Sequence, residues 1–208
     1  MLPLNPNHHH TMNPTKHFLD CEFIEDGHTI DLLSIGIVSE DGREFYAQNN
    51  LADFKKAGDF VWRNVFPNLW HFDMSGRRAC FPQEKVTDSG LSRTTITQCG
   101  PECPWMTPRE IAEAITKFCD PETFGKPELW GYYCDFDFVA FCQLFGKMID
   151  LPKGFPMYCR DLKQLCDSIG NPRLPTNTAE HHALHDAKWN REVYRFLMEY
   201  VSTASNNP

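Results

Sequence analysis

The chain has 208 residues and a formal net charge of −8 at pH 7, and 41% of its residues are hydrophobic against 23% charged. This composition excludes collagen-like and wholly disordered chains, and the acidic balance argues against a protein that coats nucleic acid through a broad basic face. A nuclease is still compatible, because carboxylates that hold divalent cations present a phosphate with metal charge.

The sequence gives no sign of a membrane or secreted protein. No stretch approaches the roughly 20 apolar residues that cross a bilayer, and the N-terminus lacks a basic segment followed by an apolar one. The nine cysteines are scattered over predicted strands and helices, unlike those of a small secreted disulfide scaffold. We therefore expect a cytoplasmic protein with mostly reduced thiols and no membrane partner.

The first half of the chain predicts a tail, a meander and an insertion. Residues 1–16 are rich in Pro, Asn and His and predict a tail, and a single domain is expected over 17–202, with a second tail at 203–208. Short strands at 17–23, 30–38 and 43–47, joined by tight turns, predict an antiparallel meander. Residues 59–65 predict a short helix. Residues 67–105 lose periodicity and indicate an insertion or a long functional loop.

The second half alternates helices and strands. Thr107, Pro108 and Glu110 form a helix start, with a cap, a proline in the first turn and a glutamate that reaches back. A buried strand at 129–133, a helix at 136–145, a short strand around Met157, a helix at 161–169 and a long helix from His182 follow. This order predicts an α/β fold in which a mixed central sheet, the meander plus parallel strands, is flanked by helices.

Asp20 and Glu22 form the first group of acids. Residues two apart on a strand face the same side, so both carboxylates point to one place in an otherwise apolar segment. Burying two like charges together is costly unless a cation compensates them. Taken alone, the pair fits two solvent-facing strand residues equally well.

Asp135 and Asp137 follow the strand predicted at 129–133, at its carboxyl end, where α/β folds place their sites. Asp135 could equally be a helix cap. Asp137 is the stronger candidate for a metal ligand.

His181 and Asp186 form the third group. A spacing of five does not place them on one helix face, so a simple chelating pair is not expected. If His181 ends the preceding loop and Asp186 lies in the first helical turns, the imidazole can reach a water as general base while the carboxylate binds metal.

Together these groups predict a convergent carboxylate cluster with a titratable base. Such a cluster is what two-metal phosphodiester hydrolysis needs. Hard oxygen ligands favour Mg²⁺ or Mn²⁺ over zinc.

The ordered motifs Asp20-x-Glu22, Asp137 and His181-x4-Asp186 resemble those of the DEDDh exonucleases, the superfamily of ribonuclease T and oligoribonuclease. More closely, the runs at 20–38, 40–46, 137–146 and 181–187 are similar to the polyadenylate-specific 3′-exoribonuclease family known from mycobacteria. About three quarters of the chain takes part in this resemblance, and residues 67–105 lie outside it.

The resemblance implies the site and the fold. Asp20, Glu22, Asp137 and Asp186 would be ligands of two Mg²⁺ ions, for which Mn²⁺ can substitute, and His181 would be the general base. It also implies a ribonuclease H-like fold, a homodimer, and release of nucleoside 5′-monophosphates from the 3′ end of single-stranded RNA, with adenylate tails as a candidate preference. Asp135 departs from the family pattern, in which a small residue or Asn is usual, so an additional carboxylate could sit near the cations.

Substrate and zinc contacts are weaker predictions. Phe23, Trp62 and Tyr133 could stack on bases, Asp135 could face the substrate, and core packing would explain each aromatic residue equally well. In the insertion, four basic residues either follow the RNA backbone or are simply solvated: Arg77, Arg78, Lys85 and Arg93. Three cysteines with a nearby histidine suggest structural zinc, although their spacing departs from C-x2-C: Cys80, Cys99, Cys103 and His71.

Three alternatives remain at this point. The same chemistry could act on single-stranded DNA, since no contact to a 2′-hydroxyl can be recognised. A catalytically silent nucleic-acid-binding module is disfavoured because all four acids and the histidine are present. A zinc hydrolase is disfavoured because no helical His-x-x-x-His pair lies near the acidic motifs.

Overall fold

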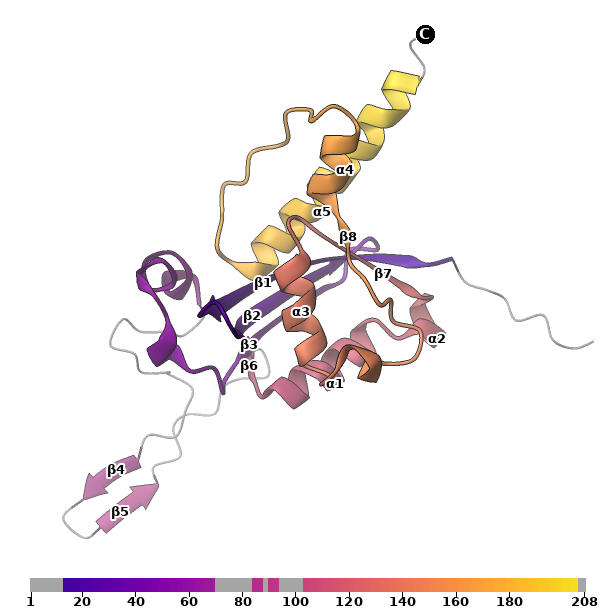
Figure 1. Cartoon of the computed structure of the whole chain (residues 1–208). Coiled ribbons are helices and arrows are strands. Elements are labelled where there is room, and N and C mark those ends of the chain that lie inside the picture. Colours follow the sequence, from indigo (N-terminus) through magenta and orange to yellow (C-terminus); the bar gives the residue numbers. More distant parts are fainter. Residues whose placement is uncertain (1–12, 70–83, 88–89, 94–102, 206–208) are drawn as a thin grey trace, which may run out of the picture.

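Figure 1 shows the computed structural model, which describes residues 13–69, 84–87, 90–93 and 103–205. Its centre is a sheet with the strand order β6-β3-β2-β1-β7-β8. Strands β1 (Thr15–Glu25), β2 (Ile30–Ser39) and β3 (Glu44–Asn49) form the expected antiparallel meander. Strands β6 (Trp105–Met106), β7 (Pro127–Gly131) and β8 (Arg160–Asp161) pair in parallel at its two sides.

Helices cover both faces of this sheet. Helices α1 (Pro108–Phe118), α2 (Pro121–Phe124) and α3 (Asp135–Gln143) lie on one side, and α4 (Leu162–Ser168) and α5 (Ala183–Ser205) on the other (Figure 1). The mixed sheet flanked by helices confirms the predicted α/β class and is consistent with the ribonuclease H-like fold.

The hydrophobic core follows from the strand and helix periodicities. Leu19 and Cys21 alternate with polar residues on β1 and pack with Ile111 and Ile115 of α1 and Phe141 of α3. The capping box predicted at Thr107 and Glu110 is present and starts α1. On the opposite face, α4 and α5 pack through four fully buried residues: Leu162, Cys166, Val193 and Leu197.

Besides a 3-10 turn (Met148–Asp150), two smaller units accompany the sheet and its helices. After β3 come a 3-10 turn (Phe54–Lys56), a π-helical turn (Val61–Val65) and a second 3-10 turn (Phe66–Asn68), which pack on Ile24 and Leu33 at the end of the meander. Strands β4 (Glu84–Thr87) and β5 (Gly90–Arg93) pair only with each other.

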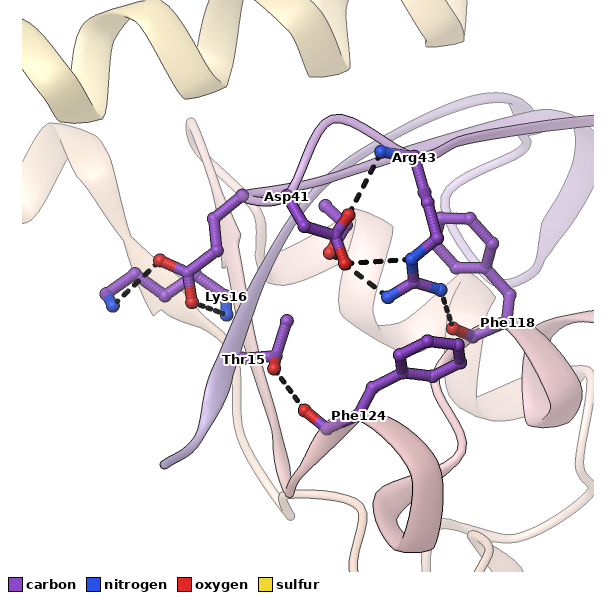
Figure 2. A network of polar contacts seen from close by, with 8 residues as sticks. Thr15, Lys16, Asp41, Arg43, Phe118 and Phe124 are labelled. Atoms are coloured by element: carbon purple, nitrogen blue, oxygen red, sulfur yellow. Dashed lines mark hydrogen bonds and ion pairs between the residues drawn. The ribbon is translucent and has the colours of Figure 1, made fainter. Parts of the chain in front are cut away.

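A polar network ties the start of β1 to the helices, as Figure 2 shows. The Arg43 guanidinium bonds to the Asp41 carboxylate at 2.8 Å and donates to the Phe118 carbonyl at 2.6 Å, with the Phe124 ring 3.6 Å from its carbon. The Thr15 hydroxyl donates to the Phe124 carbonyl. This bond and the parallel pairing of Thr15 with Pro127 place the start of β1 at Thr15, inside the tail expected at 1–16.

Three further predictions differ from the structure. The strand expected around Met157 is wrong: that side chain is 50% exposed, and the strand lies at Arg160–Asp161, where the backbone can pair with Trp130 and Gly131. The helix expected at 59–65 is largely a π-helical turn. Helix α5 continues to Ser205, into the expected tail at 203–208, although Val201, Ser202 and Thr203 are exposed.

Over the described residues, no helix combines the length and the apolar character that a membrane span requires. The seven cysteines in this part of the chain are free thiols, as expected. Part of the zinc hypothesis concerns Cys80, Cys99 and His71, which lie outside the described residues, as do Arg77 and Arg78. The extent of the insertion and the zinc site stay predictions.

Candidate active site

The first two acids lie where strand periodicity places them. Asp20 and Glu22 project from the same face of β1, and in the antiparallel register Asp20 lies opposite Gly36 and Glu22 opposite Ser34. The register shifts directly after Glu22, which is a bulge-like irregularity. Both carboxylates therefore point to the α5 side of the sheet, just before the regular ladder is interrupted.

Gly36 allows α5 to bring a third carboxylate to this pair. A Cβ on Gly36 would lie 2.3 Å from the Ala183 carbonyl oxygen, so the first turn of α5 sits directly on the β2 backbone. Asp186 lies in that turn. Carboxylate oxygens of Asp20, Glu22 and Asp186 all lie within 4.8 Å of one another.

Asp137 approaches from α3 along an open strand edge. Strand β7 pairs with β1 only as far as Phe18 and Trp130, so the following backbone groups of β1 have no strand partner on that side. Side chains satisfy them instead: the Cys21 amide donates to Asp137 Oδ1 at 2.7 Å, and Asn190 Nδ2 donates to the Leu19 carbonyl at 2.9 Å. We refer to residues 19–21 of β1 as the open edge.

The start of α3 is held by Asp161. Its carboxylate accepts from the Cys134 amide and, at the other oxygen, from the Gln164 amide, both at 2.9 Å. Cys134 is the residue before the first helical residue, so Asp135 is not the cap, and that interpretation is wrong. Asp135 is exposed on the first turn of α3, whereas Asp137 is buried.

Burial and crowding raise the pKa values of the acids. Burial, followed by the charges of Asp186 and Asp137, raises the pKa of Glu22 to about 8. Burial raises the pKa of Asp137 to about 7, although the hydrogen bond from Cys21 opposes the shift. Burial and the three neighbouring carboxylates also hold the pKa of Asp20 well above its ordinary value.

Asp186 is oriented by two donors. Asn177 Nδ2 donates to Oδ1, and the His182 amide donates to Oδ2 at 3.0 Å. These bonds oppose the rise in the pKa of Asp186 that burial causes. The carboxylate is thereby fixed in one orientation toward Asp20 and Glu22.

His181 precedes α5 and lines the same cleft, the arrangement that the spacing to Asp186 suggested. Its backbone is left-handed, with φ 68°, and its ring contacts Phe60 edge-to-face at 5.1 Å between centroids. The imidazole is thus placed beside the acids by a loop and not by the helix that carries Asp186.

The acids and His181 line one cleft of about 500 Å³. Its other lining residues are Cys21, Phe23, Tyr132, Tyr133, Asn177, Glu180, Trp189 and Asn190. Among the residues that the structure describes, no lysine or arginine lines this cleft. Four acids without a basic partner are compensated best by cations, and hard oxygen donors fit Mg²⁺ or Mn²⁺.

The predicted substrate contacts divide into two groups. Phe23 and Tyr133 line the cleft, and Phe23 also stacks on the exposed ring of Phe136 at 6.1 Å. Trp62 packs against Phe66 at 4.2 Å in the small core beside the meander, and neither Trp62 nor Asp135 lines the cleft. Trp62 therefore packs in a hydrophobic core, which was the alternative to stacking on a base.

Several cleft residues were not recognised from the sequence. Trp189 and Asn190 lie three and four positions after Asp186, so helical spacing could have found them. The Tyr132 ring contacts both the Tyr133 ring, at 4.8 Å between centroids, and the Trp189 ring, at 5.1 Å. Asn177 and Glu180 lie in an irregular segment whose sequence carries no signal of their direction.

The fold and the acidic cleft define a class: an enzyme with a ribonuclease H-like arrangement whose site suits divalent cations. The family model described as the 3′-5′ exoribonuclease Rv2179c-like domain matches residues 83–198. Two proteins of Mycobacterium tuberculosis are each 34% identical to this chain over 183 residues, which is 88% of this chain and 92% of theirs. They are 3′-5′ exoribonuclease MT2234.1 of strain CDC 1551 and 3′-5′ exoribonuclease Rv2179c of strain H37Rv. The chain therefore belongs to the Rv2179c-like 3′-5′ exoribonuclease family and is a 3′-5′ exonuclease, a phosphodiester hydrolase.

Proposed function

We propose that this protein is a DEDDh exoribonuclease that removes nucleoside 5′-monophosphates from the 3′ end of single-stranded RNA in a Mg²⁺-dependent reaction. The observation that carries the proposal is the meeting of Asp20, Glu22 and Asp186 within 4.8 Å, with His181 lining the same cleft. Membership of a family named for 3′-5′ exoribonucleases supports RNA as the substrate.

Asp20, Glu22, Asp137 and Asp186 are the residues that would hold two Mg²⁺ ions. When bound, such ions activate an attacking water and stabilise the leaving oxygen of a phosphodiester, and Mn²⁺ can substitute for them. The carboxylates have few other means of compensating their mutual repulsion, since their pKa values are raised and no lysine or arginine among the described residues lines the cleft. Asp137 accepts from the Cys21 amide at Oδ1, so Oδ2 is the oxygen left to hold a cation.

His181 is the proposed general base. A neutral imidazole accepts a proton from the attacking water and returns it to solvent after the monophosphate leaves. His181 lies before the first residue of helix α5 and lines the cleft. Its imidazole can therefore reach a water without being a metal ligand beside the carboxylates.

Phe23 and Tyr133 are the proposed contacts to the terminal bases. Both line the cleft, and aromatic faces hold single-stranded bases with little sequence preference. A preference for adenylate tails, assembly as a homodimer and action in the cytoplasm complete the proposal. The first two rest on the likeness of the motifs to polyadenylate-specific exoribonucleases.

The test uses 3′-tailed RNA with a 5′ label. Oligoadenylate and the other homopolymers are incubated with the protein in Mg²⁺ and, separately, in EDTA, beside DNA of the same sequence. We expect stepwise shortening from the 3′ end, release of 5′-monophosphates, and no reaction in EDTA. Equal rates on RNA and DNA would overturn the substrate assignment, and full activity in EDTA would overturn the metal mechanism.

A further inference from the structure

The general base has a backbone conformation that its surroundings must maintain. His181 has φ 68°, in the left-handed region that residues other than glycine seldom occupy. Such conformations persist where the surrounding structure determines them. The contacts that hold His181 should therefore bear on the position of its imidazole.

One of these contacts comes from a distant part of the chain. Asn68, at the end of the 3-10 turn Phe66–Asn68, donates from Nδ2 to the His181 carbonyl at 3.2 Å and to the Asn64 carbonyl at 2.8 Å. The Glu180 carbonyl lies 3.5 Å from the same nitrogen. The two protons of one amide thus connect the turn to the loop that carries the base.

The turn is itself fixed to the strand that carries the first two acids. Val65 and Phe66 are buried in one cluster with Leu33 of β2 and Ile24 of β1, and Ile24 is two residues beyond Glu22. Trp62 packs edge-to-face on Phe66 at 4.2 Å. Packed side chains therefore connect β1 to the turn that ends at Asn68.

The side chain of His181 has a second support from the same segment. The Phe60 ring meets the imidazole edge-to-face at 88° and 5.1 Å, and the Phe60 carbonyl is held by Asn64 Nδ2 at 2.9 Å. An edge-to-face contact favours one ring orientation over others. Backbone and ring of the base are thus both restrained from residues 60–68.

We propose that Asn68, assisted by Phe60, is a positioning residue for His181: its amide holds the loop so that the imidazole stays over the carboxylates. The inference rests on the proposed role of His181 as general base. Neither Asn68 nor Phe60 lines the cleft, so they act through His181 and not on the substrate or on the cations.

Steady-state kinetics on 3′-tailed RNA at saturating Mg²⁺ test the proposal with the full chain. Asn68→Ala should lower kcat about 10-fold and leave KM within about twofold, because a displaced base impairs the reaction and not substrate binding. Phe60→Leu should lower kcat by a smaller factor. Arg63→Ala is the matched control, because Arg63 lies in the same segment, is strongly exposed and, among the described residues, pairs only with the still more exposed Asp59. The kcat of this variant should equal that of the wild type.

The decisive comparison is made in the His181→Ala background. If Asn68 acts through His181, adding Asn68→Ala to His181→Ala lowers kcat no further. A 10-fold loss in both backgrounds, or wild-type kcat in Asn68→Ala, would overturn the inference while leaving the general base in place. Wild-type turnover by His181→Ala alone would overturn the general base and the inference together.

Discussion

Glu22→Gln should stabilise the metal-free protein at alkaline pH, although it removes a proposed metal ligand. Burial and two neighbouring carboxylates raise the pKa of Glu22 to about 8 from 4.5. Between pH 4.5 and about pH 8, Glu22 is protonated in the folded protein and ionised in the unfolded chain. The free energy of unfolding therefore falls as the pH rises through this range and stays low above it. Glutamine has the same size and no charge to bury.

The size of the effect follows from the same shift. At pH 8, which is about 3.5 units above the ordinary pKa of 4.5, the difference corresponds to at most about 5 kcal/mol. Relaxation of the acid cluster reduces this, and a gain of roughly 2 kcal/mol would raise the melting temperature of a chain of this size by about 4 to 8 °C.

Thermal melts in EDTA at pH 5 and pH 8 measure the effect. Glu22→Gln should melt above the wild type at pH 8 and close to it at pH 5, where the wild-type carboxyl is largely protonated. Saturating Mg²⁺ should shrink or reverse the difference at pH 8, since cations stabilise the folded wild type more strongly. Glu25→Gln, at the exposed end of the same strand, is the matched control and should show no such gain. The reasoning is refuted if Glu22→Gln is no more stable than the wild type in EDTA at pH 8, or if its gain is equal at both pH values.

Four further substitutions have defined outcomes. Asp20→Ala and Asp186→Ala should each lower kcat on the order of 10³-fold, which is about 4 kcal/mol of activation free energy. Their circular dichroism should stay native, because removing one acid from a repulsive cluster need not destabilise the fold. Retained Mg²⁺-dependent hydrolysis would contradict the site. His17 is fully buried, and neither ring nitrogen has a hydrogen-bond partner among the residues that the structure describes. Burial lowers its pKa to about 4. The unfolded chain therefore binds a proton first as pH falls from about 6.5 to 4, and urea titrations at pH 7 and pH 4.5 should show a loss of up to roughly 3 kcal/mol that is absent in His17→Leu. Gly36→Ala should unfold at lower urea by about 2 kcal/mol or more and lose activity, because its Cβ would lie 2.3 Å from the Ala183 carbonyl oxygen; a stable and active variant would show that α5 does not need this close approach.

The sequence predicted those parts of the site that depend on local periodicity. Asp20 and Glu22 share a face because a strand has a period of two, and Asp186 falls in the first turn of α5 because the helix starts close to the expected residue. The meander and most helices were predicted for the same reason. Strand β8 was not, because its two residues acquire their conformation from pairing with Trp130 and Gly131.

Contacts between distant segments could not be predicted from one sequence. Asp135 and Asp137 are the same residue type two positions apart. Which of them lies in the site depends on the hydrogen bond from the Cys21 amide, a group that β7 does not pair with. The bond from Asn68 to His181 spans 113 positions. Trp62 could stack on a base or on a core neighbour, and only packing against Phe66 decides its location.

The open edge of β1 has a consequence for handling inactive variants. A buried backbone N–H that loses its acceptor costs about 1 to 3 kcal/mol of stability. Asp137 accepts from the buried Cys21 amide, so the residue proposed for chemistry also stabilises the strand beside it. Asp137→Ala would uncover the amide, whereas Asp137→Asn keeps an acceptor oxygen over it. The asparagine variant is therefore the better choice for trapping an RNA complex.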